Sequence, residues 1–260
     1  MNYELPKKIK NYLVNHELER VPGGMSGAEL HKFIVEGKEY FLKIIDVNNK
    51  FSGELEVEYK LLKWLEERFK APQIIEFKKS ENNFFLLMTA IDGVTLEQYL
   101  SQSASIEDTV KIYAESLKLI HSIDITGCPN IESDDNMLVE ARKNLELGIK
   151  QSDLDGEFRD ISPIELYDKL VSLKPQSNEN VFIHGDYCLD NIIIKENKLN
   201  GIIDLGRAGV GDKYKDIALA VRTIKGDLGE EWLELFFSTY GIVKPDWNKI
   251  KFYIIMDEFF

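Results

Sequence analysis

Three side chains in the later half of the sequence have the types and the spacing that phosphoryl transfer requires. Asp186 and Asn191 stand in the order Asp-x4-Asn, and Asp204 follows after two short apolar runs. Magnesium takes oxygen ligands and keeps several waters, so an amide, a carboxylate and nucleotide phosphates together would complete its coordination. Asp186 precedes both ligands on a loop, where it could accept the proton of an attacking hydroxyl. The segment therefore predicts a kinase that acts on a small molecule.

The two apolar runs are expected to form a β-hairpin that brings the magnesium ligands together. Residues 192–194 and 199–203 are separated by Glu196, Asn197 and Lys198, which is a turn sequence. Counting outward from the turn, Asn191 meets Asp204 or its neighbour at the open end. A single Asp or Asn at such a place more often serves a turn or a cap, and we interpret His184 as a structural post. The complete ordered set favours a catalytic site.

Composition agrees with an enzyme of ordinary size in a reducing cytoplasm. The chain has 260 residues, 44% of them apolar, and its two cysteines form neither a disulfide framework nor a zinc motif. No signal peptide or membrane-spanning run is recognisable. The formal net charge of −13 disfavours nucleic acid and anionic membranes as partners. A polycationic acceptor would explain the excess of acid, although solubility alone is a sufficient alternative.

Lys43 is the candidate phosphate ligand of the first third of the chain. It lies within an apolar strand, Tyr40–Ile45, where an ammonium group needs an anion as its partner. The helix expected over residues 52–69 offers Glu54, Glu56 and Glu58, and Glu58 is the predicted partner. A glycine-rich loop at residues 21–27 precedes the expected hairpin of residues 29–45. Its glycines would permit a close approach to phosphate, although the motif is weak by itself.

A β-rich first third followed by a helical remainder predicts two lobes that are joined near residues 90–93. Further strands are expected at residues 73–78 and 84–89. ATP would lie between the lobes, with adenine bonded to backbone near Thr89 and Ile91 and packed against Phe41. The expected helices cover residues 3–14 in the first lobe and 106–122, 135–150, 164–173, 214–224, 230–240 and 247–258 in the second.

Acidic residues are concentrated in the expected helical lobe. They lie in a loop at residues 153–157, at Asp227, at Glu230 and Glu231, and at Asp257 and Glu258 just before Phe260. Several of them could line one face beside Asp186 and Asp190. Such a set of carboxylates would bind ammonium groups and not phosphate.

Five segments of the sequence resemble the aminoglycoside 3′-phosphotransferases, and together they span about Met25 to Phe260. They are His184-Gly185-Asp186 with Asn191, residues 203–207, His121-Ser122-Ile123-Asp124, Lys215-Asp216-Ile217-Ala218 and the ending 256–260. The resemblance implies an α+β, protein-kinase-like bilobal fold. Residues 1–91 would form an antiparallel β-sheet lobe that binds nucleotide, and residues 92–260 a larger, mainly helical lobe that carries catalysis and binds aminoglycoside. The implied reaction transfers the γ-phosphate of ATP, or of GTP as an alternative donor, to the 3′-hydroxyl of kanamycin- or neomycin-like antibiotics. The resemblance thus implies an enzyme that confers antibiotic resistance.

The resemblance also implies a role for individual residues. Asp186 would be the catalytic aspartate, and Asn191 and Asp204 the magnesium ligands. The nucleotide would be bound by Lys43 held by Glu58, with Met25 and Ser26 on the positioning loop, Phe41 stacked on adenine, and Thr89 and Ile91 at the hinge. The acceptor would be bound by Asp186, Arg207, Asp153, Asp155, Glu157, Asp227, Asp257, Glu258 and the Phe260 carboxylate. Gly226 departs from some relatives, which have an acid there.

Other functions remain open at this stage. The same scaffold could phosphorylate another small alcohol, such as choline, a sugar or a macrolide, with a different acceptor lobe. A catalytically inactive nucleotide-binding regulator is disfavoured because Asp186, Asn191, Asp204 and Lys43 are all present. A protein kinase is disfavoured because no Ala-Pro-Glu segment follows Asp204. The sequence does not distinguish a monomer from a homodimer.

Overall fold

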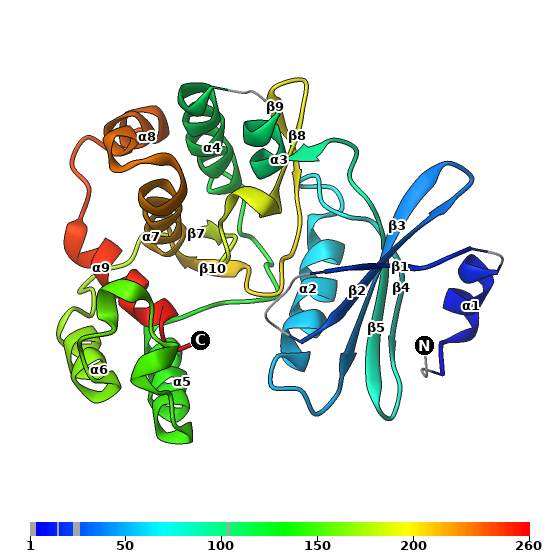
Figure 1. The fold of residues 1–260 in the computed structure, drawn as a ribbon, viewed down its shortest axis with the longest axis horizontal. Coiled ribbons are helices and arrows are strands. Elements are labelled where there is room, and N and C mark those ends of the chain that lie inside the picture. The colour runs from blue at the N-terminus through cyan, green and yellow to red at the C-terminus, as the bar shows by residue number, and fades with distance from the viewer. Residues whose placement is uncertain (1–3, 15, 23–26, 103–104) are drawn as a thin grey trace. The chain divides into compact units, whose positions relative to one another are not determined.

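The computed structural model describes residues 4–14, 16–22, 27–102 and 105–260, and the chain folds into two compact units (Figure 1). One unit contains the chain up to Val94 together with Ile192–Ala208, and the other contains Thr95–Asn191 together with Gly209–Phe260. The first unit is built on a sheet and the second mainly on helices. The predicted α+β class is therefore confirmed.

The sheet of the first unit is antiparallel and has the order β1-β2-β3-β5-β4. Its strands are β1 (Glu19–Val21), β2 (Glu29–Val35), β3 (Lys38–Asp46), β4 (Ile74–Lys79) and β5 (Asn83–Thr89). The turn between β2 and β3 consists of Glu36 and Gly37, both with positive φ. This is the two-residue turn that suits the twist of paired strands. The hairpin predicted over residues 29–45 is confirmed, whereas β1 was not predicted.

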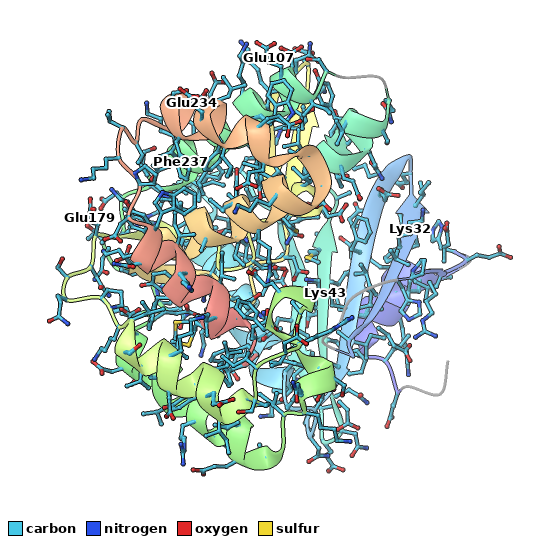
Figure 2. All side chains as sticks on the ribbon, turned by 60° about the vertical axis from the view of Figure 1, so that its left-hand side comes forward. Lys32, Lys43, Glu107, Glu179, Glu234 and Phe237 are labelled. Carbon is cyan, nitrogen blue, oxygen red and sulfur yellow. The ribbon has the colours of Figure 1, made fainter. Side chains whose placement is uncertain are left out.

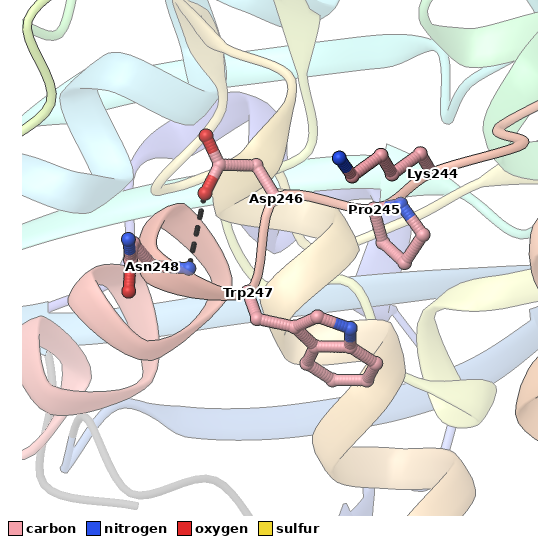
Figure 3. Close-up of a pocket in the computed structure, with 5 residues that line it drawn as sticks. All are labelled: Lys244, Pro245, Asp246, Trp247 and Asn248. Atoms are coloured by element: carbon pink, nitrogen blue, oxygen red, sulfur yellow. Dashed lines mark hydrogen bonds between the residues drawn. The ribbon is translucent and has the colours of Figure 1, made fainter.

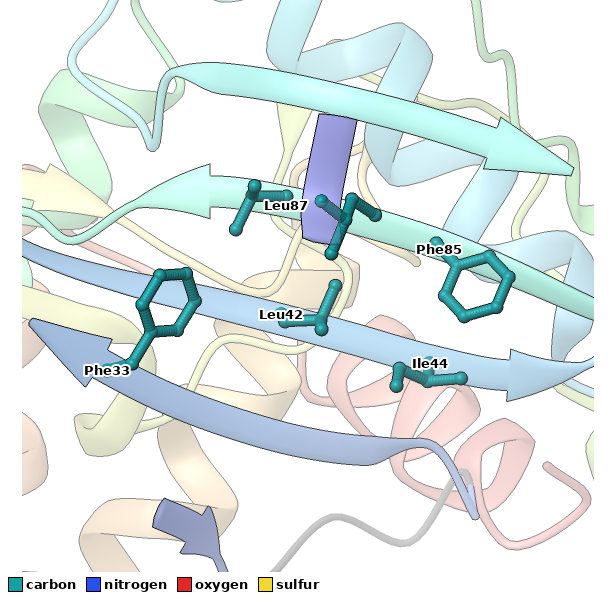
Figure 4. Packing of buried hydrophobic residues seen from close by; sticks show 6 residues of the cluster. Phe33, Leu42, Ile44, Phe85 and Leu87 are labelled. Atoms are coloured by element: carbon teal, nitrogen blue, oxygen red, sulfur yellow. The ribbon is translucent and has the colours of Figure 1, made fainter. Parts of the chain in front are cut away.

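Side chains alternate between the two faces of this sheet. On one face, Phe33, Leu42, Ile44, Phe85 and Leu87 pack beneath Ile9 of α1 (Lys7–Leu13) and form a buried apolar cluster (Figure 4). Lys43 is displaced by one residue from Leu42 and Ile44, so it belongs to the other face. There the sheet is covered by α2 (Ser52–Leu65), whose buried side chains include Leu55, Leu61, Leu62 and Leu65.

Helix α2 is shorter than the sequence predicted. The amides of Arg68 and Phe69 both donate to Leu65 O, which closes the helix in a tight turn. Pro72 follows shortly afterwards and disfavours helical backbone in the residue before it. The chain therefore leaves the helix and enters β4 within a few residues.

The hairpin predicted around residue 196 is confirmed. Strand β8 (Ile192–Lys195) pairs antiparallel with β9 (Lys198–Ile202), and Ile192 faces Ile202. The turn residues Glu196 and Asn197 have φ of 53° and 59°. The strand order is β6-β8-β9, where β6 is Val94–Thr95. Gly201 lies so close to Lys70 O and to the side chain of Ile91 that a Cβ there would approach both to within 3 Å. A glycine is therefore required at that position.

The second unit contains several helices and one short sheet. The helices are α3 (Leu96–Ser101), α4 (Ile106–Ile120), α5 (Asp134–Leu147), α6 (Pro163–Ser172), α7 (Tyr214–Thr223), α8 (Leu233–Tyr240) and α9 (Trp247–Asp257). Strand β7 (Asn180–Ile183) pairs with β10 (Gly209–Asp212), which was not predicted. The described helices include none that is long and apolar enough to cross a membrane.

Several helix ends in this unit differ from the expected ones because irregular turns flank them. Helix α7 passes into a π-helical turn over Ile224–Leu228, and α8 begins only after a 3₁₀ turn at Glu230–Trp232. Local capping fixes other ends. Ser162 and Glu165 form a reciprocal capping box at the start of α6, where Pro163 occupies the first turn.

Candidate active site

The first unit positions a lysine that bridges two carboxylates. Lys43 on β3, labelled in Figure 2, contacts both carboxylate oxygens of Glu58 at 2.8 Å and Asp204 Oδ1 at 2.9 Å. The side chain of Glu58 is only 2% exposed. Burial works against the Lys43 ammonium, but the two carboxylates outweigh it and raise the pKa of Lys43 above its ordinary value. The predicted pairing of Lys43 with Glu58 is confirmed, and this lysine stays charged.

The segment after β9 is anchored to the same helix. Arg207 Nε lies 3.2 Å from Glu54 Oε1, and Glu54 precedes Glu58 by one helical turn on α2. Asp204 has a left-handed backbone with φ of 60°, which Asp tolerates better than most residues, and its side chain is 55% exposed. Such strained positions concentrate at functional sites. Helix α2 therefore holds both Lys43 and Arg207 by two carboxylates on one face.

Some residues that were predicted to contact the nucleotide lie in the sheet and at its end. Phe41 is half-buried and lies on the same face of β3 as Lys43, opposite Met88 of β5. The Thr89 amide donates to Gln73 O at 2.9 Å, and its hydroxyl accepts from the Gln73 amide. Ile91 packs against Gly201. Met25 and Ser26, on the predicted positioning loop, lie outside the described residues.

In the second unit, a buried aspartate binds the backbone of the predicted catalytic loop. Asp216 of α7 accepts hydrogen bonds from the His184 amide at 2.7 Å and from the Gly185 amide at 2.8 Å. It also contacts His121 Nε2 at 3.1 Å. Burial opposes a charge on Asp216, but the contacts with His121 and His184 more than compensate and hold its pKa below the ordinary value. Two consecutive amides just before Asp186 are thus bound to one carboxylate.

Asn191 contacts the catalytic candidate directly. Its side-chain amide nitrogen lies 2.8 Å from Asp186 O and 3.1 Å from Asp186 Oδ2. The spacing Asp-x4-Asn therefore closes a small loop in which one side chain orients the other. His184 is fully buried, and its Nδ1 accepts from the Asp186 amide at 3.4 Å. The interpretation of His184 as a structural post is confirmed.

Cys188 lies inside this loop, but its chemistry does not suit a nucleophile. Burial and the nearby Asp186 raise the pKa of the thiol to about 12. A thiol with such a pKa is protonated at neutral pH and therefore unreactive. Asp186 accordingly stays the candidate catalytic group of this loop.

The second unit also gathers part of the predicted set of acids. Glu258 accepts the Asp155 amide at 2.7 Å, and Arg222 contacts Asp257 at 2.6 Å and Asp155 at 3.7 Å. Burial raises the pKa of Glu258 to about 7, despite the opposing hydrogen bond from Asp155 and the charge of Arg222. The 153–157 loop and the end of α9 are thus tied to the last turn of α7. The sequence interpretation missed Arg222, whose only signal was a cation within an apolar helix.

The other predicted acceptor residues have separate surroundings. Asp153 accepts the Lys150 amide and closes its own 3₁₀ turn, and exposed Glu157 lines a hollow of about 540 Å³ with Lys169 and Lys251. A hydrogen bond with Asp190 is the main cause that raises the pKa of Glu97. The charge of Asp227, which lies exposed on the π-helical turn, adds a smaller contribution in the same direction. Phe260 is 38% exposed, and its amide donates to Asp257 O.

A second hollow, of about 340 Å³, contains no predicted site residue. It is lined by Lys244, Pro245, Asp246, Trp247 and Asn248, and the Asp246 carboxylate caps the start of α9 there (Figure 3). The Asp246 carboxylate is thus already hydrogen-bonded within the helix cap.

His121 and Asp216 were recognised in the sequence only as parts of family motifs, without a role. The signal that could have found them is the cost of burying charge. Asp216 directly precedes the apolar stretch Ile217–Val221 of α7, and a buried carboxylate must collect several donors. The three donors that it collects belong to the catalytic loop and to the end of α4.

Known proteins match this chain over almost its whole length. The sequence model of the phosphotransferase enzyme family matches residues 17–253. An aminoglycoside 3′-phosphotransferase from Enterococcus faecalis is 40% identical over 264 residues, covering 99% of this chain and 97% of the relative. The crystal structure of an aminoglycoside 3′-phosphotransferase of type VIII has a TM-score of 0.81 at 25% identity, covering 98% of this chain and all of that one.

A further structure shares the fold. The aminoglycoside phosphotransferase APH(3″)-Id from Streptomyces rimosus, in complex with ADP and streptomycin, has a TM-score of 0.72 at 24% identity. It covers 91% of this chain and 94% of that one. The resemblance, the fold class and the enzyme class predicted from the sequence motifs are confirmed. The chain belongs to the aminoglycoside 3′-phosphotransferase family of phosphotransferase enzymes.

Proposed function

We propose that this chain transfers the γ-phosphate of ATP to the 3′-hydroxyl of cationic aminoglycosides of the kanamycin and neomycin type. The observation that carries the proposal is the pair formed by Asp186 and Asn191, on a loop whose preceding amides are bound by Asp216. A carboxylate fixed in this way can orient a hydroxyl and accept its proton. The proposed setting is the cytoplasm, as a monomer or a homodimer, with residues 1–91 as the nucleotide-binding lobe and residues 92–260 as the catalytic lobe.

The nucleotide would be bound mainly by the first unit. Lys43 remains charged and is already steered by Glu58, so it can receive phosphate oxygens in addition to Asp204. Phe41 offers a ring on the same face for adenine, with Thr89 and Ile91 at the end of the sheet. Met25 and Ser26, which lie outside the described residues, are proposed as further nucleotide contacts. GTP remains an alternative donor.

The chemistry of Asn191 and Asp204 fits magnesium. The nitrogen of the Asn191 amide is directed at Asp186, so its oxygen is the group left to face a cation. Asp204 presents an exposed carboxylate from a constrained backbone. Magnesium is commonly held by only one or two protein oxygens beside substrate phosphates. When bound, it would neutralise charge on the triphosphate.

In the proposed reaction, the protein contributes position and not covalent chemistry. Phosphoryl transfer depends on alignment of the attacking and leaving oxygens and on neutralisation of phosphate charge. Asp186 accepts a hydrogen bond from the 3′-hydroxyl and takes its proton as the oxygen attacks the γ-phosphorus. The bond from that phosphorus to the bridging oxygen breaks, and ADP leaves with the electron pair. Asn191 keeps the Asp186 carboxylate in orientation, and Lys43 holds the phosphates. Arg207, held by Glu54, would help to order the acceptor region.

The acceptor's ammonium groups would be bound by acidic side chains of the second unit. Asp155, Asp257 and Glu258 already lie together around Arg222, which supports their proposed role. Asp153, Glu157, Asp227 and the Phe260 carboxylate are proposed as further contacts. A kinase of choline, a sugar or a macrolide remains the alternative. The acids around Arg222 favour a polyamine over a neutral sugar.

Release of ADP by the purified protein with ATP and magnesium tests this function. The acceptor panel is kanamycin, neomycin, tobramycin, choline and erythromycin, with Asp186→Asn protein as the blank. Tobramycin lacks the 3′-hydroxyl, so turnover with kanamycin but not with tobramycin is the expected result. Turnover with choline or erythromycin alone would replace the proposed substrate, and silence with every acceptor would overturn the function.

A further inference from the structure

A chain of hydrogen bonds connects the end of α8 to the catalytic loop. Tyr240, the last residue of α8, places its hydroxyl 2.8 Å from His121 Nδ1. His121 caps the end of α4, and its other ring nitrogen lies 3.1 Å from Asp216 Oδ2. The same oxygen accepts the His184 amide at 2.7 Å, and Oδ1 accepts Gly185 at 2.8 Å. All these groups belong to the second unit.

The partners determine where the protons lie. The Asp216 carboxylate can only accept, because its pKa is held low, so Nε2 of His121 carries the hydrogen of that bond. In the tautomer with its hydrogen on Nε2, Nδ1 is an acceptor, and the Tyr240 hydroxyl at 2.8 Å is the donor that suits it. Burial, together with the charge of Asp216, raises the pKa of Tyr240, so its hydroxyl keeps its proton. Each bond therefore has one consistent direction, from Tyr240 through His121 to Asp216.

We propose that Tyr240 is a positioning residue for phosphoryl transfer, which acts through His121 and Asp216 on the two amides that precede Asp186. The inference rests on the proposed function because it assigns Tyr240 to the same reaction. Tyr240 fixes the tautomer and the plane of the His121 ring. The ring in turn fixes the Asp216 carboxylate that holds the amides of His184 and Gly185.

Loss of the Tyr240 hydroxyl removes the hydrogen-bond donor to His121, whose side chain is only 4% exposed. Nδ1 then lacks its partner, and the ring gains freedom to turn or to adopt the other tautomer. In either case Asp216 loses its fixed donor and can shift relative to the amides. A displacement of about 1 Å at a catalytic group can cost roughly a hundredfold in rate. A partial displacement of Asp186 should therefore reduce kcat by about tenfold without changing the binding of either substrate.

The test compares Tyr240→Phe with a matched control, Tyr253→Phe. The Tyr253 hydroxyl donates to Asp134 Oδ1 at 2.8 Å in the same unit, so the control also deletes one tyrosine hydroxyl that is hydrogen-bonded inside the protein. The measurements are kcat, the KM for ATP and for kanamycin, the melting temperature, and the ¹⁵N shifts of the His121 ring and of the His184 and Gly185 amides. Both variants are expected to melt at a lower temperature than the original protein.

Only Tyr240→Phe is expected to lower kcat, by about tenfold with both KM values unchanged, and to move the His121 and loop-amide shifts. Unchanged kcat in Tyr240→Phe, or equal losses of kcat in the two variants, would overturn the inference. The NMR shifts need no acceptor substrate. If the original protein phosphorylates no aminoglycoside, the proposed function fails, and unmoved loop-amide shifts in Tyr240→Phe would separately refute the positioning role.

Discussion

Tyr113 and Tyr187 exchange hydrogen bonds, because each hydroxyl donates to the other residue's backbone carbonyl, at 2.8 and 2.6 Å. Their rings stack with centroids 4.5 Å apart, and both side chains are fully buried. Tyr187 directly follows Asp186, and Tyr113 belongs to α4. The backbone that follows Asp186 is therefore bound to α4, just as the backbone that precedes Asp186 is bound to Asp216.

A double-mutant cycle of Tyr113→Phe and Tyr187→Phe should reveal this mutual dependence. Each single change removes one buried hydrogen bond, which costs about 0.5–1.5 kcal/mol. The two losses should not add, with a coupling of about 0.5–3 kcal/mol in the free energy of unfolding measured in urea. Each variant should also lower kcat, since Asp186 is the neighbouring residue. Strict additivity together with normal turnover would show that the two bonds act independently.

Asp186→Asn should lower kcat by about three orders of magnitude or more, because the amide cannot accept the proton of the attacking hydroxyl. The KM for kanamycin should change little, since acids elsewhere in the second unit would hold the ammonium groups. Steady-state kinetics measure both values, and a melting curve verifies that the variant is folded. Near-normal turnover would remove Asp186 from the mechanism.

Glu58→Gln should raise the KM for ATP by about tenfold and leave the KM for kanamycin unchanged. The change keeps the shape of the side chain but removes the charge that holds a buried ammonium, and breaking such a pair is costly. Glu56→Gln on the same helix is the control, because Glu56 pairs with Lys60 at the surface, where ion pairs contribute little. Equal effects of the two variants on ATP would show that Lys43 does not depend on Glu58.

Glu258 should titrate near neutrality. Its folded-state pKa of about 7 lies above the ordinary 4.5, so the folded protein binds this proton more tightly than the unfolded chain. The contribution of Glu258 to the free energy of unfolding should therefore fall as pH rises from about 4.5 to about 7. Urea unfolding across this range should show a smaller decline in Glu258→Gln, with exposed Glu234→Gln as the control. Parallel curves for Glu258→Gln and the original protein would contradict the assignment.

Cys188 should resist alkylation even though it lies beside the catalytic candidate. Because the pKa of the Cys188 thiol is about 12, very little thiolate is present at pH 8. Iodoacetamide should therefore alkylate Cys188 about a thousandfold more slowly than it alkylates glutathione. A Cys128→Ser background isolates the signal, and mass spectrometry of the labelled peptide gives the rate. Reaction at the rate of glutathione would mean that the loop opens readily.

Much of the fold could be predicted from local patterns in the sequence. The hairpins at residues 36–37 and 196–197 followed from turn residues between apolar runs, and the helices of the second unit followed from their periodicity. Strands β1, β6 and β10 were missed because two to four residues beside a glycine or a loop carry too little alternation. Strand β10 is defined by its pairing with β7, which depends on contacts distant in sequence.

The candidate site was predictable where one motif contains both partners. Asp186 and Asn191 lie five residues apart and do contact each other, and Lys43 found the carboxylate expected for a buried ammonium. Tyr240, Arg222 and the pairing of Tyr113 with Tyr187 were not predicted. Each joins segments far apart in sequence, and neither an arginine nor a tyrosine in an apolar helix shows by itself what its polar end will meet.

The first unit is built from two separate stretches of the chain, so it is completed late during synthesis. Strand β9 supplies partners to earlier residues, since the Ile202 amide donates to Lys70 O and the Asn200 side chain donates to Asp92 O. A ribosome adds roughly 5–20 residues per second, so residues 95–191 take about 5–20 s to emerge before this hairpin does. Throughout that interval the nascent sheet unit is incomplete and exposed to misassembly. The speed of translation across the intervening segment therefore becomes a determinant of how much folded protein a cell obtains.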